Sequence, residues 1–507
     1  MPKFNYGNQT QTDQRTMVKL NQVKNNAGGY VFKLAPMKQL ERFLILGSDS
    51  PTYYQDARQL TAENSLVVKE CWARYPDQTL DLILDLTKNN RIIKMDPILF
   101  AMALGTLDQD VLTRQKVYAH IVRVSRHASG LFMFLDFCQK LGKGWGRGLK
   151  NAVSQFYSQN KEGCDRLGYQ MIKYRQRNGF DHSRGLRLSH PSPNSDTNAN
   201  LMNWVLKKDF CEKDLPEIVQ MYLEVLKDES AFYPELPWEA YPTDRIPWSL
   251  LAPAMPYTAL IRNLNKFNLQ PLSELEDIIV KRIETDKPNM HPFNILLAWK
   301  TYSSGQGMRS KATWSVNQRI SRALEVAFYN SFQYVEPSKE RYYIGMDISG
   351  SMMMGMGRIK DSNILAGEAA MAMALSILKT EPRCYVKGFT QTMVDIPLEK
   401  VFTLRQAIGA RPNWHSGATD CALPMIDALQ KNIQVDKFII FTDNETWVGK
   451  IHPFQALEDY RNKMRINAKL IVCAMTSTGF SIANPSDEGM LDIVGCDSAL
   501  PQLISFL

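Results

Sequence analysis

The chain has 507 residues, of which 44% are hydrophobic and 10% aromatic, and it carries a formal net charge of +8 at pH 7. This length is too great for one hydrophobic core and this composition excludes a largely disordered protein, so we expect at least two folded domains. The eight cysteines form no CxxC pair, which argues against a zinc site. No apolar run reaches about 18 residues, which argues against a membrane span. We therefore expect the protein in the cytoplasm, and in the nucleus as well if the host is a eukaryote.

The positive charge is concentrated in the N-terminal part of the chain. Residues 341–507 contain 16 Lys and Arg against 17 Asp and Glu, whereas residues 1–340 contain 44 against 35. Such an asymmetry favours a polyanionic partner for the N-terminal part, although a mildly basic surface more often serves only solubility.

The N-terminal part is expected to be helical behind a polar arm. Residues 1–24 are rich in Gln, Asn and Thr and are predicted to be a flexible arm. From residue 37 to residue 300 helical periodicity dominates, and the apolar run 131–141 ends at Gly142, as a helix with a glycine C-cap does. The pattern predicts a helical bundle or an α-solenoid, although no repeat of fixed period is visible.

Residues 141–190 form a strongly basic segment, with ten Lys and Arg against three Asp and Glu. Such cations neutralise phosphates, and Tyr174, Phe180 and His190 are placed to stack on unpaired bases. The alternative is a solvated helix face with Tyr174 and Phe180 in the core, and the spacing alone favours this alternative.

Two irregular stretches follow within the helical region. Residues 191–200 are polar and are predicted to form a loop. Residues 233–248 contain four prolines, which no continuous helix tolerates, so we expect mostly extended chain and turns there.

From residue 341 onward, short apolar runs alternate with helical patterns, which is typical of an α/β domain. A core helix is predicted over residues 364–378 and an amphipathic helix around residues 456–464. The near-continuous apolar content of the short runs indicates strands of a buried parallel sheet at residues 342–346, 384–389, 438–442 and 470–475. We therefore expect a doubly wound sheet, with ligands at the carboxyl ends of its strands.

Oxygen-bearing side chains cluster at one predicted edge of this sheet. Asp347, Ser349 and Ser351 follow the first strand, while Thr419 lies in a later loop and Asp443 follows another strand. Carboxylate and hydroxyl oxygens, completed by water, suit Mg²⁺, or Mn²⁺, rather than Zn²⁺. The sequence predicts one divalent cation at these five residues.

This cluster resembles the metal-ion-dependent adhesion site of von Willebrand factor A domains. In that family the ion keeps an open position that an acidic group of a protein partner fills. The alternative is a metal that only ties three loops together and stabilises the fold. Hydrolysis is not expected, because a two-metal nuclease needs more carboxylates to hold its second ion. Asp420 and Glu445 are near in the sequence, but neither their spacing nor the family pattern makes a second site.

Longer segments resemble the Ro autoantigen family, whose members combine a TROVE domain with a von Willebrand factor A domain. The resemblance extends from Asn25 to the C-terminus and covers both parts of the chain. The segments that carry it are NNAGGYVFKL at Asn25, WGRGLK at Trp145, KYRQRNG at Lys173, LRLSH at Leu186, MPYTALIRNL at Met255, HPFNILLA at His291, GATDCALPM at Gly417 and FTDNETW at Phe441.

The resemblance implies a monomeric ring of HEAT-like helical repeats closed by the A domain. Residues 1–24 are then an arm, residues 25–340 the RNA-binding TROVE domain and residues 341–507 the A domain. It further implies that Y RNAs bind the outer surface, that single-stranded 3′ ends of misfolded non-coding RNAs enter the central hole, and that bacterial members work with an exoribonuclease.

The resemblance also assigns candidate RNA contacts within the basic segment. Lys173 and His190 fall on RNA-contacting positions of the family, and Arg175, Arg177 and Arg187 lie beside them. Contacts between residues 191 and 247 stay unassigned, because the similarity is weakest there.

The leading hypothesis is a non-enzymatic RNA-binding protein that acts in RNA quality control. The alternative is a protein-interaction adaptor whose metal site grips an acidic side chain of a partner, without RNA. A metal-dependent nuclease is a third hypothesis, which requires RNA cleavage that is lost on Asp347→Ala.

Overall fold

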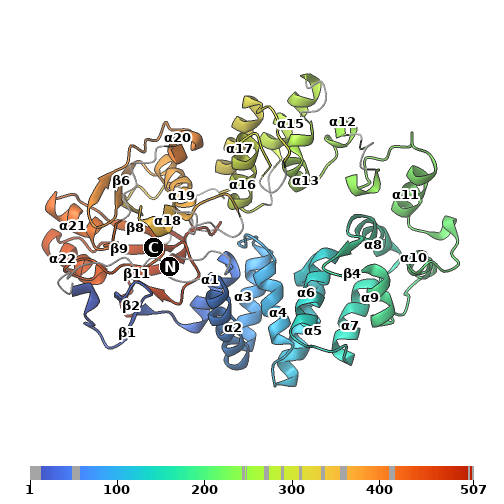
Figure 1. The fold of residues 1–507 in the computed structure, drawn as a ribbon, viewed down its shortest axis with the longest axis horizontal. Coiled ribbons are helices and arrows are strands. Elements are labelled where there is room, and N and C mark those ends of the chain that lie inside the picture. Colours follow the sequence, from blue (N-terminus) through green and yellow to red (C-terminus); the bar gives the residue numbers. More distant parts are fainter. Residues whose placement is uncertain are drawn as a thin grey trace.

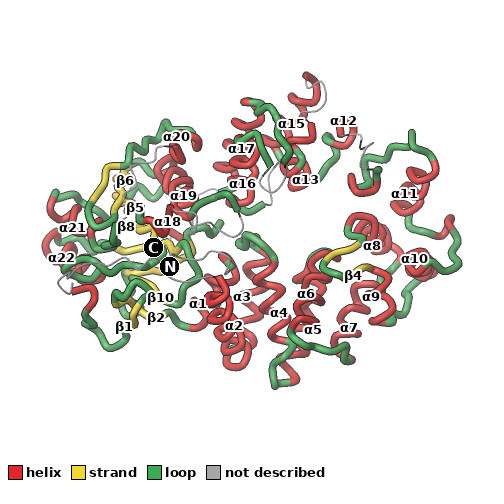
Figure 2. Tube along the Cα trace, viewed as in Figure 1, coloured by secondary structure: helices red, strands yellow, loops and turns green. Residues whose placement is uncertain are grey.

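The computed structural model describes residues 13–47, 57–242, 246, 248–267, 273–286, 290–307, 311–332, 337–353, 362–409, 417–498, 500 and 503–504. A curved row of helices makes up the N-terminal part, and a sheet covered by helices makes up the C-terminal part (Figures 1 and 2). None of the described helices is both long and apolar enough to cross a membrane.

The helices of the N-terminal part pack mainly on their next-but-one neighbours, with α4 on α6, α5 on α7 and α7 on α9, as the helices of a solenoid do. They are α1 (Pro36–Leu46), α2 (Ala57–Arg74), α3 (Pro76–Lys88), α4 (Asp96–Gly105), α5 (Val111–Ser125), α6 (Ala128–Lys140), α7 (Arg147–Tyr157), α8 (Lys161–Lys173), α9 (His182–Ser189), α10 (Asp196–Leu206), α11 (Glu217–Lys227), α12 (Trp248–Leu251), α13 (Tyr257–Arg262), α14 (Leu264–Phe267), α15 (Ser273–Thr285), α16 (Pro292–Ser303) and α17 (Gln318–Asn330). The predicted helical solenoid is confirmed.

The predicted polar loop is shorter than residues 191–200, because α10 already begins at Asp196. Ser195 caps this helix, its side chain accepting a hydrogen bond from the Asn198 amide, and Asn198 is itself fully buried. The polar composition of this segment does not indicate a loop throughout, because Ser195 caps a helix and Asn198 is buried within it. In the proline-rich stretch, the described residues contain one short 3-10 turn, η3 (Trp238–Ala240), as expected.

The C-terminal part contains a six-stranded sheet in the order β11-β9-β8-β5-β6-β7, parallel except for β7. Its strands are β5 (Arg341–Asp347), β6 (Arg383–Phe389), β7 (Met393–Asp395), β8 (Lys437–Thr442), β9 (Lys469–Ala474) and β11 (Met490–Val494). The four strands predicted from apolar runs are β5, β6, β8 and β9, so the doubly wound sheet is confirmed.

Helices cover both faces of this sheet (Figure 1). They are α18 (Gly350–Met353), α19 (Ala366–Thr380), α20 (Leu404–Gly409), α21 (Leu423–Gln430) and α22 (Pro453–Met464). Every residue of α19 from 366 to 378 is buried, as the sequence predicts for a core helix.

Part of the expected N-terminal arm belongs to the C-terminal domain. Residues 13–24 form a 3-10 turn, η1 (Asp13–Arg15), and strand β1 (Gln22–Lys24). Strand β1 pairs with β2 (Tyr30–Lys33), which pairs with β10 (Phe480–Ser481) to complete a small antiparallel sheet. The arm seemed isolated in the sequence because the Gln14 side chain bonds Asp420, 406 positions later, and because the third strand of its sheet, β10, also belongs to the C-terminal part.

Both ends of the helical row contact the C-terminal domain, which closes the ring (Figure 1). In α1 the buried Arg42 donates a hydrogen bond to Asp492 of β11 at 3.0 Å. In α16 Lys300 forms an ion pair with Glu368 of α19. The predicted fold class, a helical ring followed by a doubly wound domain, therefore agrees with the structure.

Candidate metal centre and nucleic-acid interface

Asp347 and Asp443 lie where the strand order of the main sheet reverses. The connections after β5 and β8 lead to opposite edges of the sheet, since β5 is followed by β6 and β8 by β9. Asp347 is the last residue of β5, and Asp443 directly follows β8. Ligands of doubly wound sheets bind in the crevice outside the strand ends at this point.

The buried Asp347 carboxylate is held by residues of both strand ends. Its Oδ1 accepts a hydrogen bond from the Ser349 amide at 3.0 Å, and its Oδ2 accepts one from the Thr442 hydroxyl at 2.7 Å. The Ser349 and Ser351 hydroxyl oxygens lie 3.0 Å apart. The structure thus gathers three of the five predicted metal ligands on one tight turn.

One carboxylate oxygen of Asp443 accepts no hydrogen bond from the described residues. Its Oδ1 accepts a hydrogen bond from the Glu445 amide at 3.1 Å, but its Oδ2 is buried without a hydrogen-bond partner. Burial raises the pKa of Asp443, and burial together with the charge of Asp443 raises the pKa of Asp347. A bound cation beside two buried carboxylates that repel each other would stabilise their charged forms.

The donor set fits a hard divalent cation. Two carboxylates and two serine hydroxyls supply oxygen ligands. Among the described residues, no group of three or more His, Cys, Asp or Glu side chains that could hold a metal ion occurs, at this site or at another. Mg²⁺ prefers such oxygen sets and keeps several waters. Bound there, the ion would supply a Lewis-acidic position for an anionic group, with Asp347, Ser349, Ser351 and Asp443 holding it.

Thr419 lies in a loop that is fastened beside Asp443. It is buried, and its carbonyl oxygen accepts hydrogen bonds from the Trp447 amide at 3.0 Å and from the Thr446 hydroxyl at 3.2 Å. The loop of the fifth predicted ligand therefore adjoins the loop after β8. Residues 410–416, which precede it, lie outside the described residues.

N-terminal residues form hydrogen bonds with the loop after β8, and the sequence alone did not predict this contact. Glu445 accepts hydrogen bonds from the Asn26 side chain at 2.7 Å and from the Ala27 amide at 3.0 Å. The Asn25 side chain donates to the Thr446 carbonyl at 2.7 Å. The NNAGG segment thus positions the chain two residues beyond Asp443.

Gln14 grips the loop that carries Thr419. Its side-chain nitrogen donates to Asp420 at 2.7 Å, and its side-chain oxygen accepts from the Thr446 hydroxyl at 2.7 Å. Both extra carboxylates near the proposed metal site, Asp420 and Glu445, are therefore bound by N-terminal residues. No signal in the sequence pointed to Gln14, because the contact spans more than 400 positions.

The basic segment contains a tight hairpin between α8 and α9. Strands β3 (Gln176–Arg177) and β4 (Phe180–Asp181) are joined by Asn178 and Gly179, which both have positive φ, as a type I′ turn requires. Phe180 is 1% exposed and belongs to the core, as the alternative favoured by the spacing predicts. Arg177 is exposed on the hairpin.

Lys173 ends α8 among aromatic rings. Its Nζ lies 5.4 Å from the ring centre of Tyr169 and 5.6 Å from that of Tyr174. Tyr174 is half-buried and stacks on His127 at 5.8 Å between ring centres. This cation and these ring faces combine positive charge with aromatic surface, a combination that suits unpaired nucleic-acid bases.

The other three candidate residues have different surroundings. Arg175 donates hydrogen bonds to the Tyr222 hydroxyl at 2.8 Å and to the Glu239 carbonyl at 3.1 Å, so it holds the proline-rich stretch in place. Arg187 and His190 are exposed at the far end of α9, about 12 Å along the helix from the hairpin. The five candidates thus form a group at the hairpin and a second group at the end of α9.

Arg126 and Arg166 extend the basic surface beyond the residues that the sequence suggested. The pKa of His127 is lowered mostly by the loss of solvent around its ring, and the positive charges of Lys173, Arg166 and Arg126 lower it further. Arg126 has a φ of 59°, an uncommon backbone conformation for a residue with a side chain. Within the described part of the chain, neither arginine forms an ion pair.

Comparison with known proteins places the proposed metal site and the basic surface in two domains that known families describe. The TROVE domain family matches residues 23–220, and the Ro60 vWA domain family matches residues 341–507. The RNA-binding protein RO60 of Caenorhabditis elegans is 32% identical, over 97% of this chain and 90% of its own length. The RNA-binding protein RO60 of Deinococcus radiodurans is 33% identical, over 96% of this chain and 94% of its own length.

The chain belongs to the Ro60 family. The crystal structure of the Deinococcus radiodurans RO (RSR) protein resembles it with a TM-score of 0.67 at 30% sequence identity, covering 93% of this chain and 99% of that one. The Ro60 vWA match spans all five proposed metal ligands, and the TROVE match spans all five candidate RNA contacts but ends before the proline-rich stretch.

Proposed function

We propose that this Ro60-family chain is an RNA-binding protein that acts in RNA quality control. It binds small non-coding Y RNAs on the outer surface of the ring and single-stranded 3′ ends of misfolded non-coding RNAs at its centre. The observation that carries the proposal is the basic surface around the β3–β4 hairpin, where Arg126, Arg166 and Lys173 lie close enough to shift the pKa of His127. The names of the two RNA-binding relatives support the same partner.

The physical chemistry of this surface suits RNA. Cations without internal ion pairs exchange their counterions for phosphates, which gives an affinity that falls with salt. Tyr169 and Tyr174, beside Lys173, offer ring faces to unpaired bases. In this proposal residues 25–340 form the RNA-binding domain of a monomeric ring, residues 341–507 close it, and the protein works without catalysis in the cytoplasm, alongside an exoribonuclease in a bacterial host.

The metal site has its own part in the proposal. Asp347, Ser349, Ser351, Thr419 and Asp443 bind one Mg²⁺, with Mn²⁺ as a substitute. The Oδ2 of Asp443, which accepts no hydrogen bond from the described residues, favours an ion here. An ion at the carboxyl ends of β5 and β8 can bind an acidic group of a partner protein. The same observation supports a second candidate function, that of a protein-interaction adaptor that does not need RNA.

Binding of a structured small RNA with a single-stranded 3′ tail tests the proposal. The double variant Lys173→Ala, Arg177→Ala is expected to bind at least about tenfold more weakly than wild type, and the slope of log affinity against log salt is expected to fall by about two. The measurement is fluorescence anisotropy across a salt series. If wild-type protein binds no RNA at low salt, the adaptor becomes the better explanation.

A matched control separates local contacts from net charge. Lys450→Ala, Lys463→Ala removes the same two charges from exposed positions of the C-terminal domain. Its affinity and salt slope should stay close to those of wild type. Equal losses in both double variants would mean that the basic surface acts only through the overall field of the protein.

A further inference from the structure

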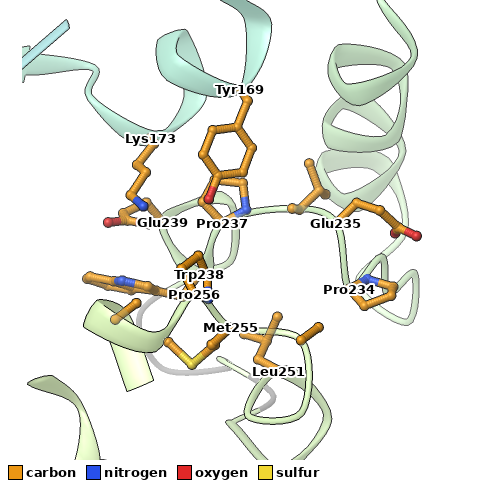
Figure 3. Close-up of a pocket in the computed structure, with 13 residues that line it drawn as sticks. Tyr169, Lys173, Pro234, Glu235, Pro237, Trp238, Glu239, Leu251, Met255 and Pro256 are labelled. Atoms are coloured by element: carbon orange, nitrogen blue, oxygen red, sulfur yellow. The ribbon is translucent and has the colours of Figure 1, made fainter. Parts of the chain in front are cut away.

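A pocket of about 230 Å³ lies beside Lys173. It is enclosed by α8, by the proline-rich stretch and by the chain from α12 to α13. Figure 3 shows the side chains of Tyr169 and Lys173 extending from α8 toward the segment that carries Pro237 and Glu239. A cavity of this size accepts one small planar molecule rather than a length of polymer.

The walls of the pocket suit an aromatic ring. Tyr169 lies on one side, and Trp238, Met255 and Pro256 lie on others. Trp238 is supported by Trp248, with ring centres 5.9 Å apart. A planar ligand would therefore replace water against apolar and aromatic surface, which is how proteins hold unstacked bases.

Two opposite charges lie at one side of the pocket without pairing. Lys173 and Glu239 both line it and influence each other's pKa, yet they form no ion pair within the described structure. One carboxylate oxygen of Glu239, Oε2, is buried and accepts no hydrogen bond. A buried acceptor of this kind costs free energy until a donor reaches it.

The unsatisfied carboxylate and the neighbouring ammonium define what the ligand must offer. It needs donors for Glu239 and an acceptor for Lys173 on the same edge. Guanine is the standard base that presents two adjacent donors, N1–H and N2–H, next to an acceptor, O6. Adenine, cytosine and uracil each present only one donor group to a carboxylate, so they would satisfy the pocket less well.

We propose that this pocket binds one unpaired guanine of the RNA, stacked along Tyr169 and Trp238, with its Watson–Crick edge on Glu239 and Lys173. The inference rests on the proposed RNA binding and adds base specificity to it. The phosphates on either side of the guanine meet exposed cations, because Arg177 lies near Glu239 and Arg262 near Lys173. The basic surface supplies affinity, and the pocket reads one base.

The test uses single-stranded oligouridylates that carry one guanine, one adenine, one cytosine or one inosine at the same internal position. Wild-type protein is expected to bind the guanine oligonucleotide about tenfold more tightly than the all-uridine one. Inosine, which lacks the N2 amino group, should lose most of this gain. Anisotropy competition against a labelled guanine oligonucleotide gives all affinities under one condition.

Glu239→Gln provides the matching change in the protein, because an amide offers one acceptor and one donor where guanine needs two acceptors. This variant should bind the oligonucleotides with equal affinities, because the guanine preference is lost. Glu162→Gln, the same substitution at an exposed position at the other end of α8, should keep the guanine preference.

The outcomes separate this inference from the proposed function. If wild type binds RNA with the expected salt dependence but treats all bases alike, the guanine pocket is wrong and the RNA-binding proposal stands. The same conclusion follows if Glu239→Gln retains the guanine preference. If no oligonucleotide and no structured RNA binds, both proposals fall together. The inosine series keeps the test valid even if the variant fails to fold.

Discussion

At the scale of single residues, the Asp443 carboxylate controls the proposed metal site. Its Oδ2 accepts no hydrogen bond from the described residues, and its repulsion with Asp347 favours a bound cation. Removing one of the two charges should remove both the repulsion and the binding. The apoprotein should tolerate the change, because it relieves the repulsion between two buried groups.

We expect Mg²⁺ to raise the thermal unfolding temperature of wild type and EDTA to reverse the rise, whereas Asp443→Asn should respond to neither. At a hundredfold excess over the dissociation constant, the stabilisation of wild type should be about 2.7 kcal/mol. Differential scanning fluorimetry with a Mg²⁺ titration measures both. Asp459→Asn, an exposed change on α22, serves as the control. An Asp443→Asn protein that Mg²⁺ still stabilises would place the ion elsewhere.

Residues were predictable where their position followed from local pattern. Asp347 and Asp443 directly follow apolar strands, so their arrival at one sheet edge could be read from the sequence. Glu239 could not be found in this way, because its importance comes from a pocket shared with α8, more than 60 positions earlier. Arg126 was missed because it precedes the basic segment 141–190 in the sequence and lies near Lys173 only in the fold.

At the scale of elements, the turn between β1 and β2 depends on close approach of Gly29 to the loop after β8. A Cβ atom at this position would lie 2.0 Å from the Thr446 carbonyl oxygen and 2.9 Å from the Trp447 Cα. Both are backbone atoms, which cannot rotate away as a side chain can. The hairpin would have to move and would lose the hydrogen bonds of Asn25.

Gly29→Ala is therefore expected to destabilise the protein by about 2 kcal/mol and to lower the unfolding temperature. It should also weaken Mg²⁺ stabilisation, because the same turn positions the chain beyond Asp443. Gly144→Ala is the control, since a Cβ there meets open space and its φ is not positive. Thermal unfolding with and without Mg²⁺ compares the two, and equal curves would show that the turn adapts freely.

Elements could be predicted when their own residues determine them. The inner strands β5, β8 and β9 are nearly continuous apolar runs, and α19 is apolar on nearly every side. The β1–β2–β10 sheet has short strands whose pairing depends on a partner far along the chain. Long-range pairing of this kind leaves only weak local signals.

At the scale of the whole molecule, the ring is closed by contacts that no local pattern reveals. Arg91 pairs with Asp497 at 2.6 Å, linking the end of α3 to the C-terminal segment. The Asn294 side chain of α16 donates to the Ile93 carbonyl at 3.2 Å, so the last helices of the row also contact its beginning. The expectation of a closed ring came from family resemblance, because helical periodicity predicts helices but not where a solenoid ends.

Lys300 offers the sharpest test of this closure. It is the cation beside Glu368, whose side chain is 1% exposed in α19, and it also donates to the Asn363 carbonyl. Lys300→Met should destabilise the protein by about 3 kcal/mol, because it removes the Lys300 ammonium from a buried carboxylate. Adding Glu368→Gln should recover much of the loss, since the buried negative charge is then gone. Lys116→Met, which breaks an exposed pair with Asp77, should cost less than about 1 kcal/mol. Chemical denaturation compares the free energies of unfolding of the three variants, and small-angle scattering reports whether the ring opens. Equal effects of Lys300→Met and Lys116→Met would mean that ring closure depends on the remaining contacts.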